Sequence, residues 1–266
     1  ALDICNATPS DLYRLFIKEL PPFASIYLSC DGNIGGDSTS VIAGFYSALG
    51  VPTASNPDHL AELLRLLATI LGKEADLAGA GTNPSNEKHL ASVSRARSVL
   101  VADHLATWFP AYLLRAKEVA PSPLSGWVCS ALDLMSILVG EDQSTGLTLE
   151  APNKAVSAFS SEMISWITSP GRSGLIITPW DLTNLAESLG LAVRIGRKRF
   201  VLEELWARAG EELLVNLHLL ALRQMNLFDA YSSSFPSLQA WAERAGRTAE
   251  LLSVKARTGP TDARES

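Results

Sequence analysis

The sequence predicts an all-α protein that forms a single globular helical domain of about ten helices. Leucine and alanine are abundant, and aromatic residues make up 7% of the 266 residues, which favours helices over a β-sandwich. Apolar side chains recur every three or four positions along most of the chain, which is the period of an amphipathic helix. A β-branched run from Ile176 to Thr178 allows one short extended segment near 174–178.

Four segments organise the first part of the chain. Residues 8–20 predict a helix because a Thr/Ser cap and an acidic first turn precede an apolar face. Residues 21–38 predict a break or a short helix and then a glycine-rich loop. Residues 40–50 predict a helix that stops at its terminal glycine, and residues 79–87 predict a linker.

The remainder of the chain continues the helical pattern. Further helices are predicted at residues 86–107, 109–119, 122–139, 153–168, 180–190, 211–230 and 236–255. Residues 192–206 allow either a hairpin or a turn followed by a helix. We expect one domain over residues 1–256 and a polar, disordered tail at 257–266.

Charge and cysteine content narrow the class of protein. The formal net charge is −6, whereas a general nucleic-acid binder is usually basic, so no nucleic-acid partner is expected. The three cysteines, Cys5, Cys30 and Cys129, are widely spaced and form no CxxC pair, which favours a reducing, cytoplasmic location. No secretory signal and no membrane span are apparent.

The four letters DHLA occur twice, and the first occurrence opens a strongly amphipathic helix at residues 56–72. Asn56 is a natural N-cap, Pro57 suits the first helical position, and Asp58 then lies in the first turn. His59 lies at the edge of an apolar stripe. The stripe comprises Leu60, Leu63, Leu64, Leu67 and Leu71. Asp58 and His59 are therefore either a plain helix start or a recognition element at the exposed end of a helix.

The second DHLA lies inside a helix. Leu100, His104 and Trp108 follow at intervals of four and share one face. Pro110 removes a backbone donor and is expected to kink or restart the helix just after Trp108. His104 and Trp108 are expected either to brace the core or to line a groove.

Three other kinds of site have weak support. Adjacent Asp and His residues rarely chelate one ion, and no HExxH motif is present, so no metal is expected. The segment GNIGGD, residues 32–37, is neither a dinucleotide-binding fingerprint nor a P-loop, and no GxSxG motif is present. A basic cluster, comprising Arg194, Arg197, Lys198 and Arg199, could form the wing of a winged helix. A helical hydrolase that uses an Asp-His pair and a winged-helix regulator remain the alternatives.

Two stretches taken together resemble the TorD/DmsD/NarJ family of molybdoenzyme chaperones. PDHLAELLRLLATIL, residues 57–71, carries the Asp-His pair, and VLVADHLATWFPAYLLRAKEVA, residues 99–120, carries a His-Leu-x-x-Trp motif. The family often has Glu-Pro-x-Asp-His, whereas this chain has Asn56-Pro57-Asp58-His59, with the proline shifted by one place. The resemblance covers about residues 10–205.

The resemblance implies an all-helical, cytoplasmic chaperone that is not an enzyme and binds no cofactor of its own. Its partners would be the apo catalytic subunit of a molybdopterin oxidoreductase, with its N-terminal twin-arginine signal, and molybdenum-cofactor biosynthesis proteins. The chaperone would be a monomer or a dimer and would assist cofactor insertion and export. The residues expected to bind the peptide are Tyr46, Pro57, Asp58, His59, His104 and Trp108.

Overall fold

The computed structural model describes residues 6–80, 83–141, 161–192 and 196–258, and this part of the chain is helical without a β-strand. The elements, in chain order, are α1 (Pro9–Tyr13), η2 (Arg14–Glu19), α2 (Ala24–Leu28), α3 (Asp37–Ala48), α4 (Leu60–Gly79), α5 (Pro84–Val99), η3 (Leu100–Leu105), α6 (Phe109–Val119), α7 (Ser122–Glu141), α8 (Ser161–Ile167), α9 (Pro170–Ser173), α10 (Pro179–Ser188), α11 (Lys198–Ala209), α12 (Glu211–Ala230) and α13 (Ser237–Thr258). The segments η2 and η3 are π-helical. The all-α prediction is confirmed.

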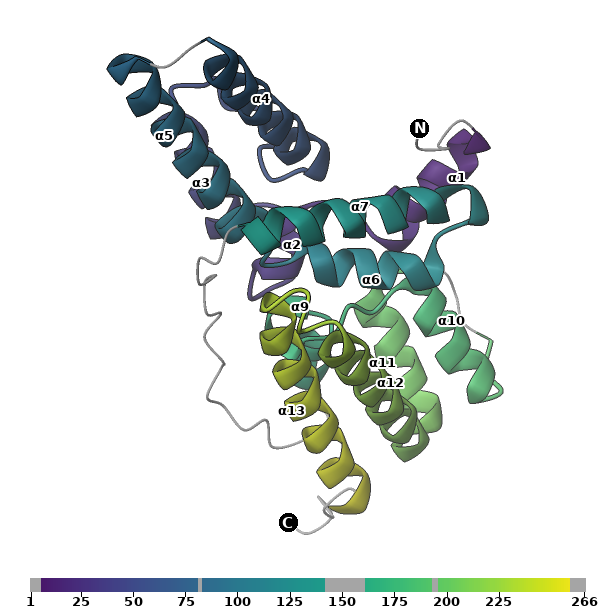
Figure 1. Ribbon diagram of the computed structural model, residues 1–266. Helices are drawn as coiled ribbons and strands as arrows, with labels where there is room; N and C mark the ends of the chain where they lie inside the picture. The colour runs from purple at the N-terminus through teal and green to yellow at the C-terminus, as the bar shows by residue number, and fades with distance from the viewer. Residues whose placement is uncertain (1–5, 81–82, 142–160, 193–195, 259–266) are drawn as a thin grey trace.

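The helices form three groups, which Figure 1 shows from top to bottom. Helices α4 and α5 form an antiparallel hairpin that projects from the body, and α6 and α7 lie side by side across the middle. Below them, α9 to α13 gather, with the hairpin of α12 and α13 as the most extensively packed pair of helices.

Two hydrophobic clusters hold these groups together. The first gathers buried side chains from η2 to α7, together with Ile176 and the region of Phe228 to Ala242. The second gathers side chains from α8 to α13. Helix α6 belongs to the first cluster and is buried along most of its length, because other helices pack around it.

The start of α4 differs from the prediction. The helix begins at Leu60, and His59 is its N-cap, whereas the local pattern predicted Asn56 in that role. Pro57 and Asp58 are buried outside the helix. The predicted restart after Trp108 is confirmed, since α6 begins at Phe109 with proline in its first turn.

The C-terminal half refines several predictions. A short extended segment was predicted near 174–178. Residues 175–178 are non-helical and buried, although they pair with no strand in the described part of the chain. Of the two alternatives for residues 192–206, the turn followed by a helix agrees with the structure, since α11 begins at Lys198, and the hairpin is wrong from that residue onward. Of the basic cluster, Arg194 lies outside the described residues, and Arg199 pairs with Glu203 at 2.9 Å. The predicted helical residues 153–160 and most of the predicted tail, 259–266, also lie outside them.

Helix α7 is the apolar exception among the surface helices. Its residues Ser122–Gly140 are long and apolar enough to cross a membrane by length and composition, and 28% of this stretch is buried. Core helices of water-soluble proteins pass the same test. The expectation that the chain has no membrane span is therefore not confirmed.

Candidate functional site

The first Asp-His pair is held against the segment that leads into α2. The N–H of Ala24 donates to the carbonyl of Asp58 at 3.0 Å, and the N–H of Leu60 donates to the carbonyl of Pro22 at 2.8 Å. These two bonds form an isolated antiparallel bridge between Phe23 and His59. His59 is therefore extended, and the residues before it form a turn closed by the bond from the N–H of His59 to the carbonyl of Asn56 at 3.1 Å, so the helix starts at Leu60 and not at Asn56.

The carboxylate of Asp58 is buried and already engaged. Its side chain is 2% exposed and accepts hydrogen bonds from the N–H of Ser25 at 3.2 Å and from the Ser25 hydroxyl at 2.6 Å. The Ser25 hydroxyl oxygen in turn accepts from the N–H of Gly35 at 3.0 Å. Asp58 thus ties the glycine-rich loop before α3 to the start of α4.

His59 caps α4 through its ring. Nδ1 accepts a hydrogen bond from the N–H of Ala61 at 3.2 Å, and the ring meets that of Phe23 edge-on at a centroid distance of 4.8 Å. Because an accepting Nδ1 carries no proton, the neutral ring carries its hydrogen on Nε2. His59 is half-buried, so it keeps some access to solvent.

Tyr46 and Trp108 are core residues. The Tyr46 hydroxyl donates to the carbonyl of Glu62 at 3.1 Å, and burial raises its pKa, with a further contribution from the Glu62 carboxylate. The Trp108 indole donates to the carbonyl of His104 at 2.9 Å and stacks on Tyr27 at 5.3 Å between ring centroids. Both side chains therefore lie in the core, where they support the candidate site.

His104 differs from the other members of the predicted site. Its ring is 6% exposed and lies 4.9 Å from that of Phe45, and burial lowers its pKa. Within the described part of the chain, no hydrogen bond engages its imidazole nitrogens. Neither nitrogen is among the fully buried polar atoms that lack a partner, so the ring keeps a narrow contact with solvent through which a ligand group can reach it.

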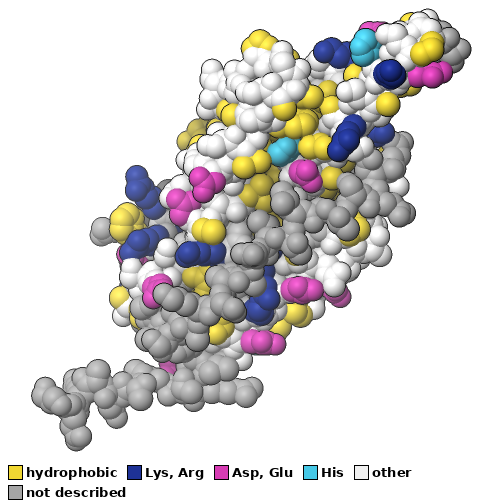
Figure 2. All heavy atoms as spheres, turned by 90° about the vertical axis from the view of Figure 1, so that its left-hand side faces the viewer, with side chains coloured by type: hydrophobic (Ala, Val, Ile, Leu, Met, Phe, Trp, Pro, Cys, Tyr) yellow, Lys and Arg dark blue, Asp and Glu magenta, His cyan; other side chains and the backbone are white. Residues whose placement is uncertain are grey.

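Apolar side chains lie on the surface of α3 and of the loop before it. Val41 and Ile34, on α3 and on the loop before it, are both 59% exposed, and Phe45 is half-buried on the same helix. Figure 2 shows one face of the molecule, on which hydrophobic side chains reach the surface among charged ones. We call Ile34, Val41, Phe45 and His104 the α3 surface.

The structure links four of the six predicted residues through α2 and α3. Ser25 of α2 holds Asp58, and Tyr27 of the same helix stacks on Trp108. On α3, Phe45 contacts His104, and its neighbour Tyr46 bonds the backbone of α4. The two DHLA motifs therefore meet neighbouring faces of α2 and α3 without forming one catalytic cluster.

No metal centre emerges from these residues. In residues 6–80, 83–141, 161–192 and 196–258, no three His, Cys, Asp or Glu side chains lie where they could share a metal ion.

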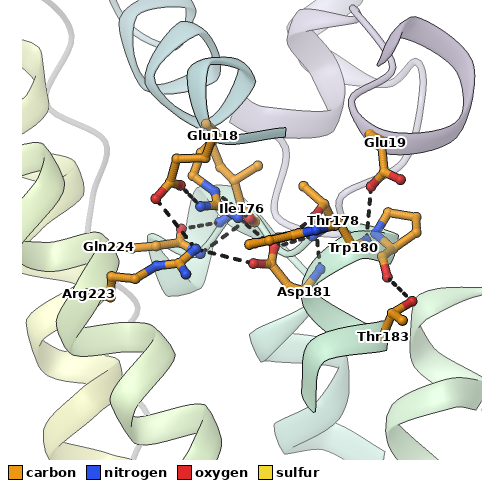
Figure 3. A network of polar contacts seen from close by, with 11 residues as sticks. Glu19, Glu118, Ile176, Thr178, Trp180, Asp181, Thr183, Arg223 and Gln224 are labelled. Carbon is orange, nitrogen blue, oxygen red and sulfur yellow. Dashed lines mark hydrogen bonds and ion pairs between the residues drawn. The ribbon is translucent and has the colours of Figure 1, made fainter. Parts of the chain in front are cut away.

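A buried ionic network that the local pattern did not indicate lies under α6 (Figure 3). Arg115 is fully buried and donates from Nη2 to Asp181 at 2.5 Å and from Nε to the carbonyl of Ile176 at 3.1 Å. It also pairs with Glu118. Arg223 reaches both Glu118 and Asp181 at 3.5 Å. The network joins α6 to α10 and α12.

The comparison with known families identifies one match. Residues 9–113 match the family described as nitrate reductase delta subunit, the family of NarJ/TorD-type chaperones. This range includes both DHLA motifs, α2 and α3. No curated protein and no solved structure matches the chain. The match covers less than half of the chain, so the likeness to the nitrate reductase delta subunit family is established for residues 9–113.

Proposed function

We propose that this protein is a cytoplasmic chaperone that binds the apo catalytic subunit of a molybdopterin-containing oxidoreductase. It would recognise the N-terminal twin-arginine signal of that subunit, or the remnant of one, and assist cofactor insertion, assembly and export proofreading. The observation that carries the proposal is the family match, because residues 9–113 contain every residue of the candidate site.

The α3 surface supports peptide binding on physical grounds. A signal peptide has an apolar middle, so its receptor needs exposed apolar side chains beside polar groups that fix the orientation. Val41 and Ile34 provide the exposed apolar area, and His104 provides a polar group without a partner in the described part of the chain. Burial of one exposed aliphatic side chain contributes about 1.5 kcal/mol or more.

The other site residues are assigned positioning roles. Asp58 would hold the loop before α3 through Ser25, and Tyr46 and Trp108 would support α3 and His104 from the core. His59, which is half-buried, is the member of the first Asp-His pair with access to the ligand. Pro57, which is buried directly before Asp58, would restrict the backbone there.

The experiment is affinity capture with the tagged, full-length chain from its native host. We expect the wild-type chain to retain the catalytic subunit of a molybdoenzyme. Val41→Asp places a charge on the α3 surface and should reduce retention at least tenfold, because an unpaired charge beside an apolar ligand is costly.

Val215→Asp is the matched control. Val215 is 48% exposed on α12, outside the matched range, so this variant should retain the subunit as the wild type does. Retention of no molybdoenzyme subunit by the wild type would overturn the proposed function. Equal retention by Val41→Asp and wild type would remove the α3 surface from the binding site.

A further inference from the structure

The carboxylate that was expected to face the ligand is unavailable in this fold. Asp58 accepts two hydrogen bonds from Ser25 and is 2% exposed. Pairing with an external cation would require those bonds to break and the segment before α4 to open. A ligand with a positive charge must therefore find another carboxylate.

Asp103 has the properties that Asp58 lacks. It belongs to η3, where its five companions, from Leu100 to Leu105, are all buried and Asp103 alone is not. Within the described residues, no hydrogen bond or ion pair engages its carboxylate. His104 follows it directly in the chain, and the negative charge of Asp103 opposes the lowering of the His104 pKa by burial.

The surroundings of Asp103 define the ligand that it fits. His104 beside it is in contact with Phe45, and Val41 lies one helical turn before Phe45 on α3. A half-buried carboxylate in a turn whose next residue contacts an apolar surface favours a cation carried on an apolar chain. A guanidinium fits best, since its planar donors match a carboxylate and it is weakly hydrated.

We propose that Asp103 is the specificity-determining carboxylate of the peptide site and pairs with an arginine at the edge of the apolar segment that binds the α3 surface. This inference rests on the proposed function and adds the contact that selects a basic, rather than a neutral, apolar segment. His104 then satisfies one of its ring nitrogens on the backbone of the same segment.

The π-helical turn explains why this aspartate is presented. In η3 the N–H of Ala106 donates to the carbonyl of Val101 at 2.7 Å, five residues back. The wider turn shifts the following side chains relative to an α-helix. Asp103 thereby leaves the core while both neighbours, Ala102 and His104, stay buried.

The test uses the full-length chain and a synthetic peptide in which two arginines precede eight alternating leucines and alanines. Binding is measured by titration calorimetry at low salt. Asp103→Asn should weaken binding about tenfold, the effect of losing one charge-assisted contact of about 1.4 kcal/mol. Replacing both arginines by the neutral isostere citrulline should weaken wild-type binding by a similar factor.

Combining the two changes tests the pairing itself. Asp103→Asn should bind the arginine and citrulline peptides equally, because the partner charge is already absent. Asp133→Asn, an exposed aspartate on α7, changes the net charge identically and should bind like the wild type.

Two outcomes would overturn the inference and are distinguishable from failure of the proposed function. If wild type and Asp103→Asn bind the arginine peptide with equal affinity, Asp103 has no role, while the peptide site stands. If the wild type binds no peptide and also captures no molybdoenzyme subunit, the proposed function fails with it.

Discussion

The substitution Asp181→Asn removes one charge from the centre of the buried network under α6 while it preserves the size of the side chain. The Asp181 carboxylate accepts from Arg115 at 2.5 Å, from the N–H of Thr178 at 2.8 Å and from the Thr178 hydroxyl at 2.9 Å. Asp181 is 3% exposed, and Arg115 is fully buried. Burial lowers the pKa of Arg115, and the Asp181 carboxylate opposes that shift.

Loss of this charge should cost about 3 kcal/mol of folding free energy. Removing one partner of a buried ion pair typically costs about 3–5 kcal/mol, since the other charge stays buried without compensation. We expect the lower end because Glu118, whose side chain is 28% exposed, still pairs with Arg115. With a urea dependence of about 3 kcal/mol/M, the unfolding midpoint should fall by about 1 M.

Urea unfolding followed by circular dichroism measures this shift. Glu203→Gln is the control, because it breaks an exposed pair with Arg199 that should contribute less than about 0.5 kcal/mol. A midpoint for Asp181→Asn that is no lower than that of Glu203→Gln would refute the structural role of the network.

Three other predictions follow from single residues. Gly174 has φ of +71°, and a Cβ there would lie 2.5 Å from the N of Ala245, so Gly174→Ala should lower the unfolding free energy by more than about 2 kcal/mol. Gly44→Ala, in an open helical position, should instead raise it by up to about 1 kcal/mol in the same urea assay. Burial lowers the pKa of His104 in the folded state, so stability should be unaffected above pH of about 6.5 and fall below it by up to about 1.4 kcal/mol per pH unit. His104→Gln should remove this slope in urea titrations between pH 7 and pH 5. Burial lowers the pKa of Lys198 to about 8, against the opposing effects of Asp181 and Glu19, so NMR of the ¹³C-methylated protein should show one lysine that titrates near pH 8.

The helical architecture could be predicted because its signals are local. The apolar stripe of α4 places Leu60, Leu63 and Leu67 in the core, as the period of 3.6 residues requires. Pro110 restarts the helix at α6 because proline is tolerated only in a first turn. Signals of this kind do not depend on the rest of the fold.

Signals that depend on distant partners could not be predicted. Asn56 and Pro57 form a good local cap, but the bonds made by Ala24 and Leu60 hold His59 in an extended conformation and move the cap to that residue. The buried role of Arg115 needs Asp181, 66 residues away, and such a side chain ordinarily lies at the surface. Nor does sequence periodicity announce a π-helical turn, which inserts one residue into the helical repeat.

The two DHLA stretches show how far the same letters can differ in their structural surroundings. In the first, packing against α2 supplies two donors to Asp58, so that carboxylate becomes an internal link between loop and helix. In the second, the π-turn buries His104 and leaves Asp103 partly in solvent with no hydrogen bond or ion pair among the described residues. A carboxylate that already has donors gains little from a guanidinium, whereas an unpaired, half-buried one gains a strong contact at low desolvation cost. Recognition of a basic segment should therefore depend on Asp103. Asp58 should instead be needed to keep the first motif folded.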